Sequence, residues 1–190
     1  SLNTAAIHNP SLIASASEHF GSSTITISIE AIQKPDGSYE AYTDNGREPT
    51  GMDAVEWAHR ATQLGAGELL ITSIDREGTG NGFDINLIKE ISQSVNIPVI
   101  ACGGAGQSEH IKQVITEGGA DAVAVSSVLH YGIIENQLIE TTSYEEGNTE
   151  YLKSQRRFSK VEPLSLGSIK KVLLENNIPV RPVADENSHE

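Results

Sequence analysis

The chain has 190 residues, and 26 Asp and Glu against 13 Lys and Arg leave a formal net charge of -13. This balance argues against a nucleic-acid partner, because such proteins neutralise phosphates with basic side chains. The length suggests one domain, and the single cysteine, Cys102, cannot form an intramolecular disulfide. Apolar runs such as residues 68–74 are too short to cross a membrane. We therefore expect a cytoplasmic protein with no membrane partner.

The first recognisable element is a strand. Residues Thr24–Glu30 alternate β-branched apolar and small polar side chains, which is the period of a strand, and Glu30 lies at its carboxyl end. Residues Tyr39–Thr43 lie between two turns, at 34–37 and 44–46, and predict a short hairpin strand. We expect this hairpin strand to be an excursion outside the core.

Helices and strands then alternate along the chain. Apolar residues at helical spacing predict helices after Asp53, after Asp84 and from Ser108. Short apolar runs predict strands at Glu68–Ser73, Pro98–Cys102 and Ala122–Ser126. Strands that alternate with helices of this length imply right-handed βαβ units on a parallel sheet. The four strands indicate an α/β fold, as half of an eightfold barrel or as a small open sheet.

The alternation stops after Tyr131. The helix expected after the last strand is delayed until Ser165–Asn176, so residues 133–163 are interpreted as an insertion. We assign residues 1–183 to one half of a (β/α)8 barrel, with four parallel βα units and this insertion before the last helix. The polar tail 184–190 is expected to be disordered.

Three strand ends carry residues suited to anion binding. They are the segments 75–79, 102–106 and the pair Ser126-Ser127, and each follows directly on a predicted strand. Glycine lets the main chain approach a ligand closely, so its N–H groups and a following helix start can hold a phosphate. A tight turn alone would also explain the Gly-Gly-Ala-Gly run at 103–106. Its combination with Gly78 and the serine pair favours phosphate binding.

Single carboxylates and histidines give weaker signals. Glu30 closes its strand and is a candidate general acid or base, whereas Glu68 begins the next strand at the opposite end. An ordinary solvated carboxylate explains either residue equally simply. The six histidines show no metal-binding spacing, and no histidine motif accompanies Cys102. We therefore expect no metal and no cofactor.

Longer motifs point to a family. The sequences SLNTAA at 1–6, GAGELLITSIDREGT at 65–79, GGAG at 103–106 and SVLH at 127–130 resemble the second half of the cyclase subunit of imidazole glycerol phosphate synthase. The similarity runs from residue 1 to about residue 131 and resumes from about Ser165 to Arg181. Motifs of this length in this order are highly specific.

The resemblance implies a (β/α)8 barrel of two similar halves and a lyase of histidine biosynthesis. Such an enzyme takes ammonia from a glutaminase partner and converts a bisphosphorylated, small-molecule substrate into imidazole glycerol phosphate. Glu30 matches the catalytic carboxylate, which is an aspartate in the family, and Glu68 matches a charged residue at the ammonia entrance. The residues that match the phosphate site of this half are Glu77, Gly78, Gly103, Gly104, Ser126 and Ser127. Those that match the other phosphate site are Asn3 and Thr4.

Two alternatives stay open. Glu30 in place of aspartate and the 133–163 insertion resemble a related branch that uses ammonia to amidinate a sugar in surface-polysaccharide biosynthesis. The chain is alternatively an assembly module, inactive alone, that pairs with the missing N-terminal half barrel or with a second copy.

Overall fold

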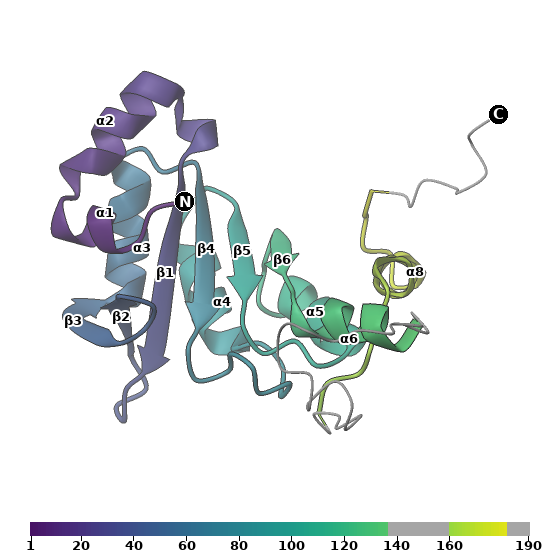
Figure 1. Cartoon of the computed structure of the whole chain (residues 1–190). Coiled ribbons are helices and arrows are strands. Elements are labelled where there is room, and N and C mark those ends of the chain that lie inside the picture. The colour runs from purple at the N-terminus through teal and green to yellow at the C-terminus, as the bar shows by residue number, and fades with distance from the viewer. Residues whose placement is uncertain (137–159, 182–190) are drawn as a thin grey trace, which may run out of the picture.

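The computed structural model describes residues 1–136 and 160–181. Its centre is a six-stranded sheet in the order β3-β2-β1-β4-β5-β6 (Figure 1). Strands β1 (Thr26–Gln33), β4 (Glu68–Ser73), β5 (Val99–Cys102) and β6 (Ala122–Ala124) pair in parallel. The predicted α/β fold and its four parallel strands are therefore confirmed, with both ends of β4 as predicted and the other strand ends differing by up to three residues.

Helices separate the parallel strands. They are α3 (Ala54–Gln63), α4 (Ile85–Ser94) and α5 (Ser108–Thr116). Asp53 caps α3 because its carboxylate accepts hydrogen bonds from the Val55 and Glu56 amides, at 2.9 and 3.0 Å. Asp84 caps α4 in the same way, through the Leu87 amide at 3.1 Å. Both helix starts agree with the sequence analysis.

One face of the parallel strands β1, β4 and β5 is buried. On β1, Ile27, Ile29 and Ala31 are buried, and the same alternation gives buried Leu69 and Ile71 on β4. These side chains join α3, α4 and α5 in a single apolar cluster. The residues between them, such as Ser28, point to the opposite face and are only half-buried. This second face is called the open face below.

The chain before β1 forms two helices that apolar periodicity did not reveal. They are α1 (Thr4–His8) and α2 (Ser11–Phe20), followed by the short 3₁₀ turn η1 (Ser22–Thr24). Leu2 pairs with Ile27 in a parallel bridge. This bridge brings the residues after Leu2 beside the middle of β1.

The hairpin after β1 belongs to the core. Strand β2 (Tyr39–Thr43) pairs antiparallel with β1 and with β3 (Glu48–Asp53). Tyr39, Ala41 and Thr43 are all buried, with Tyr39 only 1% exposed. The expectation that this strand is an excursion outside the core is wrong, because its alternate side chains pack between the sheet and α3.

A helix directly follows the last strand. This helix, α6 (Ser127–Asn136), contradicts the expected delay after β6, and its low amphipathicity explains why periodicity missed it. The final helix, α8 (Leu166–Glu175), lies within one residue of its predicted bounds and packs against α5. Most of the predicted insertion, residues 137–159, and the predicted tail lie outside the described residues. No described helix has the length and apolar character needed to span a membrane.

Candidate functional site

Four residues form a row across the open face at the carboxyl ends of the strands. The strand register pairs Glu30 with Thr72, Thr72 with Cys102, and Cys102 with Ala124. Neighbours in such a row are about 4.8 Å apart along the hydrogen-bonding direction. Glu30 is half-buried there, so its carboxylate borders the end of the sheet where ligands of parallel α/β proteins bind.

Asn3 holds Glu30 from the other side. The Asn3 amide Nδ2 donates to Glu30 Oε2 at 3.2 Å, because the Leu2 bridge places Asn3 beside the second half of β1. Asn3 Oδ1 is buried and has no hydrogen-bond partner among the described residues. Thr4 lies next to this pair and uses its hydroxyl to accept a hydrogen bond from the Asp44 amide at 3.1 Å. The structure thus brings Asn3, Thr4 and Glu30 together.

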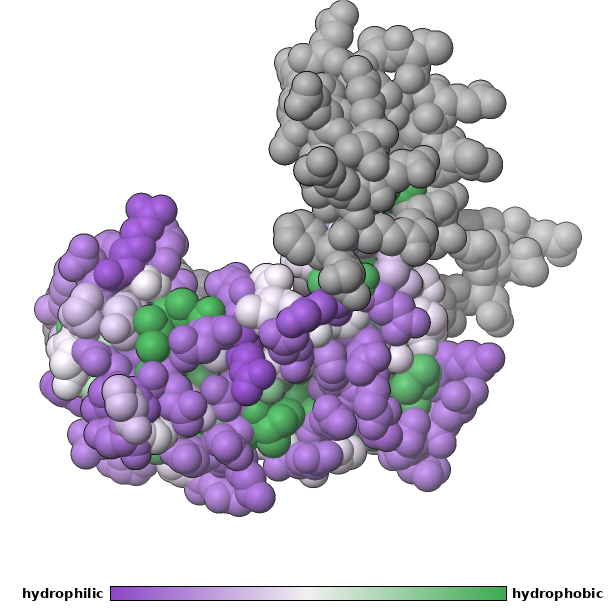
Figure 2. All heavy atoms as spheres, turned by 90° about the horizontal axis from the view of Figure 1, so that it is seen from below, coloured by the Kyte–Doolittle hydropathy of each residue, from purple (hydrophilic) through white to green (hydrophobic). Residues whose placement is uncertain are grey.

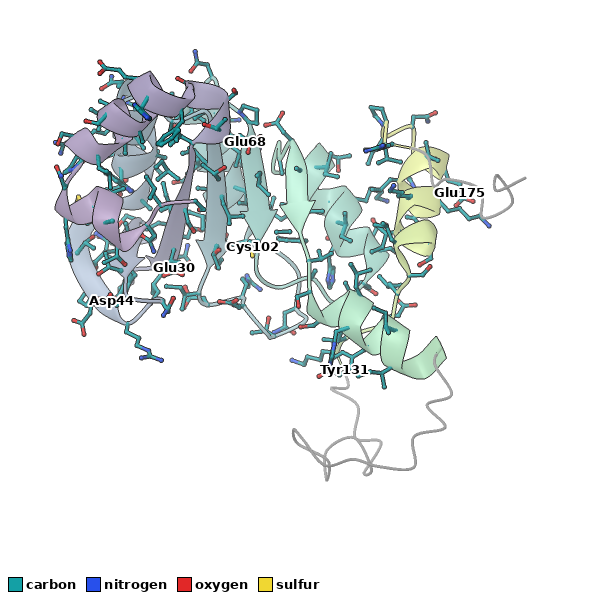
Figure 3. All side chains as sticks on the ribbon, turned by 45° about the horizontal axis from the view of Figure 1, so that its top comes forward. Glu30, Asp44, Glu68, Cys102, Tyr131 and Glu175 are labelled. Carbon is teal, nitrogen blue, oxygen red and sulfur yellow. The ribbon has the colours of Figure 1, made fainter. Side chains whose placement is uncertain are left out.

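Glu68 lies at the opposite end of the sheet. It pairs with Thr26 in the register of β1 and β4, and Thr26 Oγ1 donates to its Oε2 at 3.3 Å. Figure 3 shows Glu30 and Glu68 at opposite ends of these strands. The two carboxylates cannot act at one centre.

The glycine-bearing loops after β4 and β5 are packed backbone to backbone. Gly82 N donates to Gly104 O at 2.8 Å, which ties one loop to the other. A side chain at Gly104 would meet the Gly82 carbonyl, and the Gly104 φ of +107° is also a conformation that favours glycine. The main-chain N–H groups of Gly78 and Gly104 have no hydrogen-bond partner in the described part of the chain. Gly78 is exposed, whereas Gly104 is buried between the two loops.

The remaining predicted phosphate residues lie at the same end. Gly103 packs against the Ser73 carbonyl, and Glu77 is exposed in the β4–α4 loop. Ser127 begins α6 and Ser126 precedes it, one strand away from the Gly103–Gly106 loop. Helix starts carry unpaired N–H groups, so the start of α6 adds hydrogen-bond donors at this end. Viewed from this end, the surface is mainly hydrophilic with separate apolar patches (Figure 2).

Burial shifts the pKa of two groups near these loops. Burial raises the pKa of Tyr39, and the hydrogen bond that Tyr39 Oη donates to Asp84 Oδ1 at 2.9 Å raises it further. Burial lowers the pKa of His110, whose neutral Nδ1 accepts a hydrogen bond from the Gly106 amide at 3.1 Å. The sequence analysis identified Asp84 only as a helix cap and missed Tyr39 and His110, because neither belongs to a local motif.

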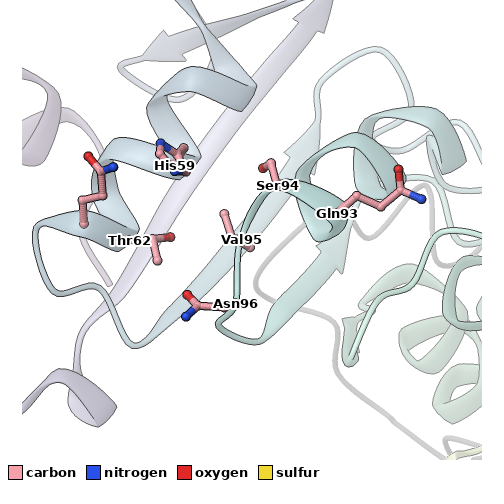
Figure 4. Close-up of a pocket in the computed structure, with 7 residues that line it drawn as sticks. His59, Thr62, Gln93, Ser94, Val95 and Asn96 are labelled. Atoms are coloured by element: carbon pink, nitrogen blue, oxygen red, sulfur yellow. The ribbon is translucent and has the colours of Figure 1, made fainter.

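Two other features do not form part of this site. A pocket of about 550 Å³ lies between the carboxyl ends of α3 and α4, lined by polar side chains such as His59, Thr62 and Asn96 (Figure 4). These residues precede β4 and β5, so the pocket is at the opposite end from the glycine loops. Within residues 1–136 and 160–181, no group of His, Cys, Asp and Glu is arranged to hold a metal ion.

The fold and site together define a protein of parallel βα units with a candidate anion site at the carboxyl ends of its strands. The chain belongs to the histidine biosynthesis protein family, which matches residues 1–135 and hence every predicted site residue. It is similar to the imidazole glycerol phosphate synthase subunit HisF of Bacillus cereus (strain ATCC 10987 / NRS 248), with 48% identity over 132 residues. That alignment covers 70% of this chain and 52% of the relative. The chain thus spans about half the length of this curated relative.

Proposed function

We propose that this chain forms part of a cyclase of the imidazole glycerol phosphate synthase type. It would use ammonia from a glutaminase partner to form imidazole glycerol phosphate in histidine biosynthesis. The observation that carries the proposal is the common location of Glu30 and the glycine loops at one end of the sheet. A phosphorylated substrate held by these loops has its reacting part beside a carboxylate.

The phosphate is held chiefly by main-chain groups. The free N–H groups of Gly78 and Gly104 and the start of α6 at Ser126-Ser127 provide the donors. The net charge of -13 does not oppose this, because such donors act over a few ångströms. Glu77 and Gly103 shape the same loops, while Asn3 and Thr4 serve a second phosphate near Glu30.

Glu30 is the proton-transfer group in this proposal. The hydrogen bond from Asn3 orients its carboxylate. Glu68, at the other end of the strands, borders the ammonia entrance. This arrangement lets ammonia enter at one end of the sheet and react at the other.

The open face supports a half-barrel architecture. On the open face, several side chains are only half-buried, namely Ser28, Glu30, Leu70 and Ile100. In a complete barrel, such inward-facing side chains fill the interior. We expect an N-terminal half barrel, or a second copy of this chain, to cover it. Sedimentation should therefore show a dimer or larger assembly at micromolar concentration, and a stable monomer would contradict this architecture.

Phosphate binding is best tested at Gly78. A side chain at Gly78 meets no atom within 4 Å, whereas one at Gly104 would disrupt loop packing. Gly78→Asp adds a negative charge, and Gly78→Asn is the control with the same shape and the same left-handed backbone. Like-charge repulsion at this exposed position is about 1 kcal/mol. Calorimetry should give inorganic phosphate an affinity about five- to tenfold weaker in Gly78→Asp, and equal affinities would refute the site.

Catalysis is tested at Glu30 in the protein that contains both barrel halves. Glu30→Gln should lower ammonia-dependent turnover by at least about 100-fold, because it removes the proton-transfer group, while phosphate affinity is retained. Glu56→Gln, on the exposed surface of α3, is the matched control. Full activity in Glu30→Gln would show that this carboxylate is only the solvated end of a strand.

One observation favours a second function, the amidination of a sugar in surface-polysaccharide biosynthesis. The family match ends at residue 135, so the segment that joins α6 to α8 lies outside it. Glu30→Asp separates the two functions. It should preserve or raise cyclisation in a histidine-pathway enzyme, whereas in the sugar enzyme it should lower the native activity and yield no cyclisation.

A further inference from the structure

The segment Lys160–Leu164, called the brace below, contacts the glycine loops although it lies outside the family match. Glu162 N donates a hydrogen bond to Gly106 O at 2.7 Å, and Leu164 N donates to Val128 O at 2.9 Å. The first bond ties the brace to the β5–α5 loop, and the second ties it to the first turn of α6. The brace therefore connects two of the three predicted phosphate-binding segments.

The brace also touches the third segment, the β4–α4 loop. A Cβ at Gly80 would lie 2.5 Å from Lys160 O and 3.1 Å from a methyl group of Val161. A Cβ at Gly106 would lie equally close to Lys160 O and would also meet the Gly80 carbonyl. Three backbones thus meet where only glycine leaves room. Gly80 and Gly106 are both buried at this meeting point.

These contacts reach the free amide of Gly104 through two short connections. Gly106 is two residues beyond Gly104 in the same loop, and its N–H is held by His110 Nδ1. Gly80 is two residues before Gly82, whose N–H is bonded to Gly104 O. Because interlocked backbones have little freedom to shift independently, displacement of the brace moves the loop that carries Gly104.

We propose that the brace is a positioning element of the phosphate site, which holds both glycine loops in the arrangement that binds an anion. The inference rests on the phosphate site proposed above and assigns it a part that the family match does not include. Phosphate binding and the packing of the brace against the loops are then thermodynamically linked. Bound phosphate must stabilise the packed brace by the same free energy by which the packed brace strengthens phosphate binding.

This reciprocity is testable in the unaltered chain by amide hydrogen exchange. Saturating inorganic phosphate should slow exchange of the Glu162 amide by about three- to tenfold. The Gly37 amide, bonded to Lys34 O in an exposed turn of the β1–β2 hairpin, is the internal control and should not change. Phosphate that binds without slowing exchange at Glu162 overturns the proposal.

Two variants test the hydrogen bond itself. Glu162→Pro removes the N–H that donates to Gly106 O, and Glu162→Ala removes only an exposed side chain. One hydrogen bond corresponds to a phosphate affinity about three- to tenfold weaker in Glu162→Pro than in Glu162→Ala. Equal affinities with a lower free energy of unfolding would assign the brace a structural role only and overturn the proposal. If Glu162→Pro does not fold, the exchange experiment decides.

Failure of the phosphate site is recognised separately. If the unaltered chain binds no phosphate, the proposed function fails, but the effect of the brace on the loops can still be measured without a ligand. Exchange of the Gly82 amide, which donates to Gly104 O, should then be faster in Glu162→Pro than in Glu162→Ala. Unchanged exchange at Gly82 overturns the brace independently of any ligand.

Discussion

Removal of the hydrogen bond between Tyr39 and Asp84 is the most direct test of how the hairpin stabilises the β4–α4 loop. Tyr39 is 1% exposed and Asp84 8%, and the Tyr39 hydroxyl donates to Asp84 Oδ1 at 2.9 Å. The same carboxylate oxygen accepts from Leu87 N and starts α4. One buried carboxylate therefore connects β2 to the end of the loop that carries Gly78.

Tyr39→Phe removes this bond and the longer one that the hydroxyl accepts from Gln33 Nε2 at 3.3 Å, because phenylalanine differs by a single oxygen atom. A hydrogen bond to an ionised group contributes about 1.5–3 kcal/mol, and the variant leaves Asp84 buried with one donor fewer. We expect the free energy of unfolding to fall by about 2 kcal/mol. That is a large share of the roughly 5–15 kcal/mol that stabilises a typical domain.

The pH dependence of stability gives a second signature of the same bond. The native state raises the pKa of Tyr39, chiefly by burial, so it binds the phenolic proton more tightly than the unfolded chain does. The stabilisation is complete below about pH 10, the unfolded value, and is lost as the pH rises above it. Tyr39→Phe should lack this part of the alkaline loss.

Urea unfolding followed by the fluorescence of Trp57, the single tryptophan, measures both effects. A double-mutant cycle with Asp84→Asn isolates the pairwise term from the capping of α4. A free energy of unfolding for Tyr39→Phe within about 0.5 kcal/mol of the parent value would refute the reasoning. So would an alkaline loss of stability identical to that of the parent.

Three further predictions concern local structure. Asp53→Ala should cost about 1 kcal/mol by removing the cap of α3, and Asp53→Asn should recover most of it in urea unfolding. Gly67→Ala should destabilise by several kcal/mol because its Cβ would strike the backbone of η1, whereas Gly37→Ala, with open space, should cost only about 1–2 kcal/mol of backbone strain. Native His110 favours the neutral ring, so stability should fall as the pH drops below about 6.5, and His110→Gln should reduce this slope in unfolding midpoints measured from pH 8 to 5.

The sequence alone determined the order and type of the main elements. Strand alternation at Thr24–Glu30, helix caps at Asp53 and Asp84, and short apolar strands are local signals, because each reflects the burial or capping of nearby residues. They predicted the parallel βα units to within a few residues. The glycine motifs likewise indicated which strand ends to consider as a site.

Tertiary structure decided which distant residues meet. The local sequence predicts that the hairpin strand carrying Tyr39 lies at the surface, but β1 and α3 cover it in the folded chain. Helix α6 lacks the periodicity that marks an amphipathic helix. Asn3 reaches Glu30 only through the bridge from Leu2 to β1, a contact that spans 27 residues of sequence. Backbone contacts between loops leave no pattern in side-chain type beyond an isolated glycine, so their partners emerge only when the sheet brings the strand ends together.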